Sequence, residues 1–580
     1  MKFAIIYFNK AAEKIARKID EKMEGEIYFS PSKETVQKLF NDGISIVGIC
    51  ASGILIRFLA PLINDKQNEP AVIAISNDGA NVVPLLGGHH GANDLAQEIA
   101  DLFDGQAAIT TASNVKFLCA LDEPPNGYIL ANANLAKNAM VAVLNGAKIF
   151  LDGEASWLKE AGYPISKSGK VQIVISEKTA DKNILTYHPK TLIIGVGCER
   201  YLPFSELIKL VESTLEKNNL SPLSIAAIAS IDVKADEKAM NILAEYFNVP
   251  LRLFSADELA KEIVPNPSKI VKAEVGTPSV AEASAIKAGE LVVTKQKSKG
   301  ATCAIGKANA PIDVENFGRA RGILHIVGIG PGEENQRTLS AIKALKKAKD
   351  WVGYGFYLDL VSDLKQQQIE HRFPLGDEEK RVRHALELAA NGKEVALICS
   401  GDGQIYAMAA LVFELLEATG KRAISENAKR VEIISHAGIS AMQMASNRVG
   451  ALLGHDFCAI SLSDLLTPRA AILERLEKAA KGDFVTAFYN PRSKTRTDLL
   501  DEAKRVFLKY RPSSTPIIIA RALGRKEEKV RILTLGEFET SEVDMMSIVL
   551  FGSSNSKSFL RGDGEMVAFT PRGYDKKAGK

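Results

Sequence analysis

The stretch ILHIVGIGPGEENQRTLSAIKAL, residues 323–345, begins with an apolar run, breaks at three closely spaced glycines and then repeats leucine and isoleucine at helical spacing. This order predicts a strand, a glycine loop and a helix, an arrangement in which backbone amides approach a ligand at the start of the helix. Short apolar runs alternate with longer amphipathic stretches along the whole chain, for example at 44–50, 191–197, 394–400 and 484–490. The sequence therefore predicts several α/β domains.

Length and composition limit the remaining possibilities. At 580 residues the chain should form about two to four domains, because single hydrophobic cores stop growing at roughly 250–300 residues. The formal net charge of +3 gives no global basic field, which argues against nucleic acid as a partner. Six cysteines lie far apart without zinc-type spacing, so we expect no metal site and a reducing, cytoplasmic setting. The first apolar run, about six residues long, is too short for a signal sequence or a membrane span.

The best candidate for a linker is the polar, turn-rich segment GKANAPIDVENFGRARG at 306–322, which lies between two series of predicted strands. We therefore divide the chain near residue 310. The predicted parts are an N-terminal domain at 1–124, a middle region at 125–190, a third domain at 191–306, a linker at 307–320 and a C-terminal domain at 321–575.

The glycine loop at 328–332 is the first candidate ligand site. Its third glycine comes one residue early for the dinucleotide fingerprint, and Glu333 and Glu334 would repel a pyrophosphate, so we disfavour a nucleotide-dependent dehydrogenase. A second predicted strand at 394–400 leads directly into Gly401-Asp402, and an aspartate at the carboxyl end of a strand suits a ligand with hydroxyls or a cation. S-adenosylmethionine carries a ribose, an ammonium and a sulfonium, which fits this chemistry.

Five motifs follow one another in the second half: GIGPG at 328–332, SGDGQIY at 400–406, GHDFCAISLSDLLTP at 454–468, YNPRS at 489–493 and TPRGY at 570–574. In this order they resemble precorrin-3B C17-methyltransferases of the tetrapyrrole methyltransferase superfamily. The resemblance covers residues 321–575 and implies a two-lobed (class III) α/β fold with S-adenosylmethionine bound between the lobes. It also implies a cofactor site formed by Gly401, Asp402, Ile405, Tyr406, Ser440, Tyr489 and Asn490. The family's usual Pro-Gly before Ser-Ala is Ala437-Gly438 here, which removes a fixed φ but keeps the glycine.

The same resemblance implies methylation at C17 of precorrin-3B or its cobalt counterpart, with ring contraction through a δ-lactone, and a homodimer formed through this half. The methyl step needs mainly positioning, because a sulfonium is already an activated donor. Ring contraction also needs proton transfer, for which His455 and Asp456 are candidates. A buried structural His-Asp pair is the alternative. His436 is either a loop residue or a substrate contact.

Corrin precursors carry a rim of acetate and propionate carboxylates, so their binding face needs arginine and lysine. Arg492, Lys494 and Arg496 follow the predicted strand at 484–490, and Arg521 and Arg525 follow the next one. Both groups lie at carboxyl ends of strands, where open α/β sheets bind ligands; a solvated basic loop is the alternative. The expected substrate contacts are Gly330, Pro331, Arg492, Arg496 and Arg521.

The first half contains a second set of motifs, including RFLAPLINDK at 57–66, LLGGHHGAND at 85–94, TTASN at 110–114, GVGCERY at 195–201, ASIDVKADE at 229–237 and VGTPSVAEASA at 275–285. Singly they are ordinary caps and loops. As a set they resemble cobalt-precorrin-5A hydrolases, which implies opening of a δ-lactone by water with release of acetaldehyde. His89 or His90 is the candidate base, Lys234 or Arg57 the candidate oxyanion donor, and Cys198 a less favoured nucleophile because no activating histidine accompanies it.

The joint prediction is a bifunctional enzyme of cobalamin biosynthesis that uses S-adenosylmethionine and acts on tetrapyrroles. The alternative is a methyltransferase fused to a module that binds corrinoids without hydrolysing them, which the unusual TTASN segment favours. The residues leave open whether the substrate ring carries cobalt and whether the pathway depends on oxygen.

Overall fold

The computed structural model describes residues 3–23, 25–64, 69–88, 91–110, 117, 119–493 and 496–574. The chain divides into two compact units, one formed by 1–231 with 237–318 and the other by 232–236 with 319–580. The division after residue 318 falls inside the predicted linker 307–320. No helix in the described ranges is both long and apolar enough to cross a membrane.

The first unit begins with a six-stranded sheet in the order β2-β1-β3-β4-β5-β6. Its strands are β1 (Phe3–Tyr7), β2 (Glu26–Phe29), β3 (Ser45–Ile49), β4 (Val72–Ile75), β5 (Asn81–Leu86) and β6 (Gln106–Ala107), with helices α1 (Lys10–Met23), α2 (Lys33–Asn41), α3 (Ser52–Leu59) and α4 (Ala92–Leu102). Strands β1 to β4 run parallel, and β5 pairs antiparallel to β4. The carboxyl ends of β3 and β4 therefore lie at one edge.

Two further sheets complete this unit. The four-stranded sheet has the order β7-β10-β9-β8 and the five-stranded sheet the order β13-β12-β11-β15-β14. The former contains β7 (Tyr128–Leu130), β8 (Ile149–Asp152), β9 (Val171–Ile175) and β10 (Leu185–Pro189) with α6 (Ala133–Leu144) and α7 (Ser156–Glu160). The latter contains β11 (Leu192–Cys198), β12 (Ile225–Ile231), β13 (Leu251–Phe254), β14 (Glu290–Lys297) and β15 (Ala301–Lys307) with α8 (Phe204–Lys217), α9 (Lys238–Tyr246), α10 (Ala256–Leu259), α11 (Lys269–Val275) and α12 (Val280–Ile286).

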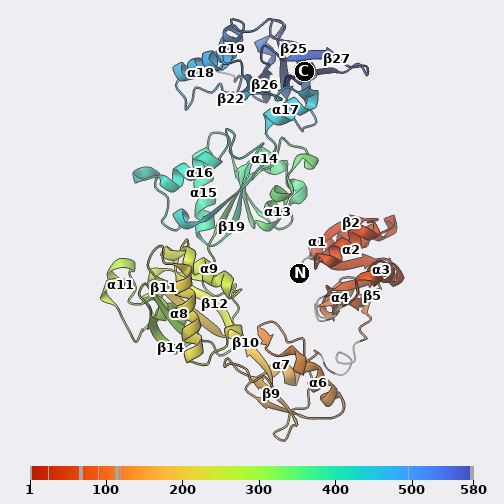
Figure 1. Cartoon of the computed structure of the whole chain (residues 1–580), viewed down its shortest axis with the longest axis vertical. Coiled ribbons are helices and arrows are strands. Elements are labelled where there is room, and N and C mark those ends of the chain that lie inside the picture. The colour runs from red at the N-terminus through yellow and green to blue at the C-terminus, as the bar shows by residue number, and fades with distance from the viewer. Residues whose placement is uncertain are drawn as a thin grey trace. The chain divides into compact units, whose positions relative to one another are not determined.

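The second unit begins with a lobe whose five strands all run parallel, in the order β18-β17-β19-β16-β20. Its elements are β16 (Ile323–Gly328), α13 (Leu339–Lys347), β17 (Asp350–Tyr354), α14 (Gly355–Asp359), β18 (Ile369–Phe373), α15 (Glu378–Ala390), β19 (Glu394–Cys399), α16 (Ala409–Glu417) and β20 (Glu432–His436). Helices α13 and α14 lie on one face of the sheet, and α15 and α16 lie on the other (Figure 1).

Burial on both faces explains why the strands of this lobe read as continuous apolar runs. In β16, Leu324 and Ile326 pack in the cluster under α15 and α16, whereas Val327 packs in the cluster under α13. Parallel pairing also brings the carboxyl ends of β16, β19 and β20 to one edge. That edge carries the glycine loops.

The second lobe follows α17 (Ala441–Val449) and has the order β22-β23-β26-β24-β25. Its elements are β22 (Phe457–Ser461), α18 (Arg469–Lys481), β23 (Val485–Tyr489), α19 (Leu499–Phe507), β24 (Pro516–Arg521), β25 (Lys529–Thr534) and β26 (Ser547–Phe551), beside a small sheet of β21 (Gly450–Ala451), β27 (Lys557–Leu560) and β28 (Met566–Phe569). Strands β22 and β23 run parallel, and the remaining pairs of the main sheet run antiparallel. The predicted α/β class and the two-lobed second half are confirmed.

Candidate active site

Three loops meet at the carboxyl edge of the first-lobe sheet: 328–332 after β16, 400–403 after β19 and 437–440 after β20. Gly330 and Gly401 exchange two backbone hydrogen bonds, with N···O distances of 3.1 and 2.7 Å. A Cβ atom on Gly438 would lie 2.1 Å from the carbonyl oxygen of Gly401 and 2.6 Å from that of Gly328. Only glycine allows this approach of three backbones. The loops therefore form one rigid rim.

Asp402 ties the second loop to the third. Its Oδ2 accepts a hydrogen bond from the Gly438 amide at 3.0 Å, and its Oδ1 accepts one from the Gln404 amide at 2.8 Å. Ser440 caps α17: its hydroxyl accepts from the Gln443 amide, and its own amide donates to Gln443 Oε1 at 3.0 Å. This reciprocal capping fixes where the third loop becomes a helix.

The second lobe contributes residues that follow β23 and β24 and residues around the start of β26. Asn490 and Ala522 have φ angles of 50°, and Tyr406 in the facing loop has a φ of 51°. These values lie in the left-handed region that non-glycine residues rarely adopt. Such strained conformations persist where the surrounding structure imposes them, and they cluster at functional sites.

The loops of the two lobes line a cavity of about 560 Å³ in the second unit. This volume lies within the range of roughly 300–1,000 Å³ that is typical of small-molecule sites. The wall contains all seven residues that the sequence resemblance assigns to the cofactor: Gly401, Asp402, Ile405, Tyr406, Ser440, Tyr489 and Asn490.

Two aromatic groups shape this cavity. The rings of Tyr406 and Tyr489 lie 5.1 Å apart, and the Tyr406 hydroxyl donates to the Ala459 carbonyl at 2.9 Å. Burial raises the pKa of Tyr489, whose hydroxyl accepts from the Met442 amide at 3.3 Å. Tyr354, Phe356 and Tyr357 of the first lobe form the second group. The cavity thus offers flat apolar surfaces as well as polar loops.

Only some of the predicted substrate contacts lie at the wall of this cavity. Pro331 lies on the cavity wall, and Gly330 supports that wall through its pairing with Gly401. Arg492, Arg496 and Arg521 are absent from the described wall.

Each of these three arginines has partners inside its own lobe. Arg492 donates to two backbone carbonyls, Arg496 donates to a third at 3.0 Å, and Arg521 Nε lies 2.7 Å from the Asp544 carboxylate. Their side chains are thus held by groups other than those of the described cavity wall.

Two other arginines do lie on the wall, Arg381 from α15 and Arg525 from the loop after β24. Arg525 belongs, with Arg521, to the basic residues that the sequence analysis places after one predicted strand. Arg381 carries no motif and sits in an amphipathic helix, so no signal in the sequence distinguishes it from a solvated helix residue.

His455 and Asp456 are largely exposed and do not lie on the described cavity wall. They precede β22, whereas Tyr489 ends the parallel strand β23 and Asn490 follows it, so the pair lies at the opposite edge of the sheet. Their side chains are 53% and 78% exposed, with His455 Nδ1 3.3 Å from an Asp456 oxygen. Neither residue lies on the described wall of the cavity. The proton-transfer role predicted for them has no support in this geometry.

His436 precedes the third loop and ends a chain of hydrogen bonds. His325 Nε2 lies 2.8 Å from Glu394 Oε1, His325 Nδ1 lies 3.0 Å from His436 Nε2, and His436 Nδ1 lies 2.7 Å from Ser340 Oγ. With both rings neutral, each bond in this chain has one donor and one acceptor. Burial, followed by the neighbouring His325, lowers the pKa of His436. His436 therefore supports the loop instead of lining the described cavity wall.

Among the candidate residues of the first half, His89 and His90 lie outside the described residues. Arg57 Nη1 donates to the Gly53 carbonyl at 3.0 Å on its own helix. Glu282, fully buried in α12, accepts three hydrogen bonds: two from Asn266 and one from the Lys295 amide, at 2.8 to 3.0 Å. Glu282 is therefore a structural anchor.

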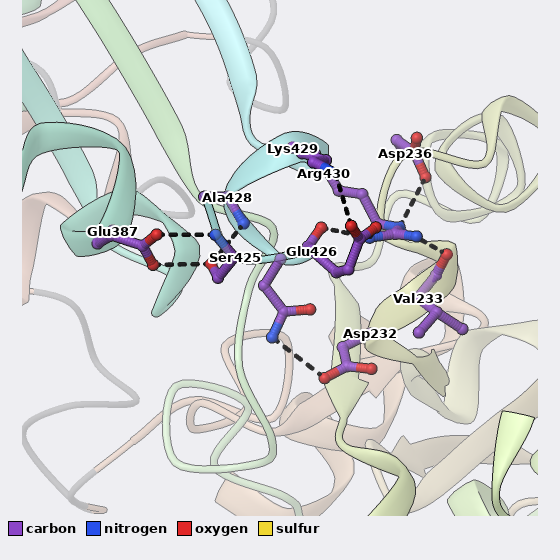
Figure 2. A network of polar contacts seen from close by, with 10 residues as sticks. Asp232, Val233, Asp236, Glu387, Ser425, Glu426, Ala428, Lys429 and Arg430 are labelled. Atoms are coloured by element: carbon purple, nitrogen blue, oxygen red, sulfur yellow. Dashed lines mark hydrogen bonds and ion pairs between the residues drawn. The ribbon is translucent and has the colours of Figure 1, made fainter. Parts of the chain in front are cut away.

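The ASIDVKADE motif contains the segment 232–236, which belongs to the second unit. Asp232 Oδ2 accepts a hydrogen bond from Arg319 and one from the Asn427 amide group at 3.4 Å. Arg430 donates from Nε to the Val233 carbonyl at 2.9 Å, and the same nitrogen lies 3.9 Å from Asp236 (Figure 2). These contacts favour a structural role for both aspartates.

The first unit has its own small cavity, of about 250 Å³, where β3 and β4 end. Its polar lining consists of Cys50, Ser52, Ser76, Asn77 and Asn81. Burial raises the pKa of Cys50 to about 11, so its thiol stays neutral and is a poor nucleophile near neutral pH. No group of three or more potential metal ligands occurs among the residues described.

Three family models match separate parts of the chain. Residues 34–114 match the family model "Cobalamin synthesis G N-terminal", 192–306 match "Cobalamin synthesis G C-terminus", and 323–539 match "Tetrapyrrole (Corrin/Porphyrin) Methylases". Over 253 residues the chain is 38% identical to a precorrin-3B C(17)-methyltransferase from Sinorhizobium sp, covering 44% of this chain and 97% of that protein. It is 40% identical over 252 residues to a probable cobalt-factor III C(17)-methyltransferase of Salmonella typhimurium, covering 43% of this chain and 99% of that protein. The crystal structure of the methyltransferase CobJ aligns with 36% identity, 43% coverage of this chain, full coverage of CobJ and a TM-score of 0.39.

The chain therefore belongs to the tetrapyrrole methylase family, and residues 34–114 and 192–306 of its first half match the two cobalamin synthesis G domains. It is an S-adenosylmethionine-dependent methyltransferase of cobalamin biosynthesis. The cobalamin synthesis G domains precede the methyltransferase part in the same chain.

Proposed function

We propose that the second unit methylates C17 of precorrin-3B, or of its cobalt counterpart, and promotes ring contraction, while the first unit opens the δ-lactone of cobalt-precorrin-5A with release of acetaldehyde. The observation that carries the first part is the cavity whose wall brings together seven residues from separate motifs. The names of the relatives from Sinorhizobium sp and Salmonella typhimurium support the position of the methyl group.

The residues on the wall fit S-adenosylmethionine. The backbones at Gly328 and Gly438 leave no room for side chains between the loops, which suits a ligand bound mainly through main-chain groups. Asp402 adds a carboxylate, which attracts a cation or accepts hydrogen bonds from hydroxyls. When bound, the cofactor supplies a methyl group already activated on a sulfonium.

The contribution of the chain to the methyl step is positioning. The Gly401–Tyr406 loop is held by Asp402 to the Gly438 amide, and Tyr489 is held at the Met442 amide, so both sides of the cofactor site are fixed before binding. The aromatic rings of the first lobe offer a flat apolar wall for a macrocycle.

The methyltransferase assay tests this proposal directly. The full chain is incubated with S-adenosylmethionine and either the metal-free or the cobalt-loaded precorrin-3 series, and the products are analysed by mass spectrometry. We expect a gain of one methyl group with one of the two substrates. Loss of the gain in Asp402→Ala would tie it to the cavity. No gain with either substrate would refute the assignment.

The hydrolase part rests on the two cobalamin synthesis G domains and on the polar cavity at the ends of β3 and β4. The test is acetaldehyde release from the lactone substrate by the full chain, with a double variant His89→Ala/His90→Ala and with Asp402→Ala as the matched control. Release by wild type and by Asp402→Ala, with loss in the double variant, supports hydrolysis by the first half. Retained corrinoid binding without release in any protein supports the alternative, a corrinoid-binding module.

The proposed assembly is a homodimer formed through the second unit, in the cytoplasm. Exposed apolar side chains support an interface there: Leu465 and Leu466 are 79% and 98% exposed. All six cysteines are free thiols, which fits a reducing compartment. Light scattering with size exclusion tests the dimer, and the double variant Leu465→Ser/Leu466→Ser should shift the mass to that of one chain.

A further inference from the structure

The charged side chains on the described cavity wall are few: Glu378, Arg381, Asp402 and Arg525. Asp402 is occupied by two backbone amides, as described above, and Glu378 Oε1 accepts from the Gly376 amide at 3.1 Å. Neither arginine forms an ion pair with a carboxylate among the described residues.

Arg381 is a nearly buried cation without a carboxylate. Arg381 is 3% exposed, its Nη2 donates to the Pro374 carbonyl at 3.0 Å, and its Nη1 lies 4.0 Å from the Met408 sulfur. Its Nε is buried without a hydrogen-bond partner. No described acidic oxygen lies within 4.0 Å of the guanidinium. Burial of an unpaired charge is costly unless an anion completes it, so the site is incomplete as it stands.

Arg525 approaches the same cavity from the other lobe. Its guanidinium carbon lies 4.7 Å from the centroid of the Phe356 ring, a cation–π contact that joins the two lobes. Its Nε is also buried without a hydrogen-bond partner. Stacking on a flat ring fixes the plane of the guanidinium while leaving its edge for an acceptor.

We propose that Arg381 and Arg525 together bind side-chain carboxylates of the tetrapyrrole and so fix the orientation of the ring in the cavity. This rests on the proposed methyltransferase function and names the residues that hold its substrate. It replaces the predicted contacts Arg492, Arg496 and Arg521, whose side chains have partners within their own lobe.

Charge decides between the two carboxylate-bearing ligands of the site. S-adenosylmethionine has one carboxylate but also an ammonium and a sulfonium, so its net charge at neutral pH is positive and two guanidinium groups would repel it. The macrocycle carries several acetate and propionate groups and is a polyanion. Two guanidinium groups in a confined cavity are therefore complementary to the macrocycle.

The experiment compares Arg525→Gln, Arg525→Lys, Arg381→Gln and the control Arg531→Gln in the full chain. Arg531 is a surface residue of the same lobe, 53% exposed and paired with Glu542, so its removal changes the charge but not the cavity. Methylation kinetics give KM and kcat for the tetrapyrrole, and calorimetry with S-adenosylhomocysteine gives the cofactor affinity separately. Binding of uroporphyrin and of its methyl ester, followed by absorbance, probes the carboxylates without turnover.

We expect Arg525→Gln and Arg381→Gln to raise KM and weaken uroporphyrin binding by about 10-fold to 100-fold, the loss typical of a hydrogen bond to a charged group. Arg525→Lys should recover part of the loss, because it keeps the charge but not the planar fork. The methyl ester should bind wild type and variants equally. Arg531→Gln and the affinity for S-adenosylhomocysteine should stay at wild-type values.

Three results would contradict the proposal that Arg381 and Arg525 bind carboxylates of the tetrapyrrole. Unchanged KM and uroporphyrin affinity in both glutamine variants would show that the carboxylates bind elsewhere. Weaker binding of S-adenosylhomocysteine, equal to the rise in KM, would assign the arginines to the cofactor. Equal losses for uroporphyrin and its ester would show a shape effect. A wild-type chain that methylates neither precorrin would instead contradict the proposed methyltransferase function. Failure of that function is thus distinguished from failure of the proposed roles of the arginines. If Arg381→Gln does not fold, Arg525→Gln alone decides.

Discussion

Replacing Gly438 by alanine is the sharpest perturbation of the cofactor site, because it adds a single carbon at the point where three loops touch. The new Cβ would lie 2.1 Å from the Gly401 carbonyl oxygen and 2.6 Å from that of Gly328, where ordinary contacts are 3.4–4 Å. Both obstacles are backbone atoms, so no side chain can rotate away. The loops must separate by about 1 Å, and overpacking of this kind costs about 1–3 kcal/mol.

The strain acts on the rim that the cofactor needs, since Gly438 also donates its amide to Asp402 at 3.0 Å. If the bound state requires the closed rim, affinity for S-adenosylhomocysteine should fall by about 5-fold to 150-fold, the equivalent of that cost. Isothermal titration calorimetry measures this without turnover. Gly562→Ala is the matched control, because nothing lies within 4 Å of the position where its Cβ would be. Wild-type affinity in a folded Gly438→Ala protein would show that the close approach of the loops is irrelevant to binding.

Further outcomes follow from other contacts. Asp402→Ala removes the acceptor of two backbone amides and should weaken S-adenosylhomocysteine binding by about 1–3 kcal/mol in calorimetry; unchanged binding would exclude Asp402 from the site. Because burial and His325 lower the pKa of His436, the unfolded chain binds this proton more readily, so stability is full above about pH 6.5 and is lost as pH falls below it. Thermal melting from pH 7.5 to 5.5 should show a smaller loss in His436→Gln than in wild type or in the exposed control His455→Gln, and parallel curves for all three would contradict the assignment. Arg448→Ala should cost no more than about 1 kcal/mol in thermal melts, because the bridge to Glu333 and Glu528 is partly exposed, and high salt should reduce the difference.

Much of the fold could be predicted because local patterns dictate it. The apolar runs at 44–50, 191–197, 394–400 and 484–490 form β3, β11, β19 and β23 within one or two residues at each end. Both faces of the first-lobe sheet are covered, so its strands are apolar throughout and easily recognised. The compact units separate after residue 318, where the chain is polar and turn-rich.

The cavity residues could be predicted for a related reason. Gly401, Asp402 and Tyr406 follow β19, while Tyr489 ends β23 and Asn490 follows it, so each group lies at the carboxyl end of a strand in its own sheet. The motif that contains His455 and Asp456 does not by itself say whether the pair lies at the cavity edge of its sheet or at the opposite edge. His455 and Asp456 precede β22, so they lie at the edge away from the cavity.

Sequence by itself thus determined the α/β class and the family, because these depend on the order and spacing of residues. Only the tertiary structure decided which cations face the cavity. Arg521 ends β24 and pairs with Asp544, whereas Arg525, four residues later, lies against Phe356 of the other lobe. Arg381 reaches the cavity from an amphipathic helix, and no motif in the sequence marks it. The direction of a side chain depends on the packing of two lobes that are distant in sequence, and spacing along the chain carries no record of it.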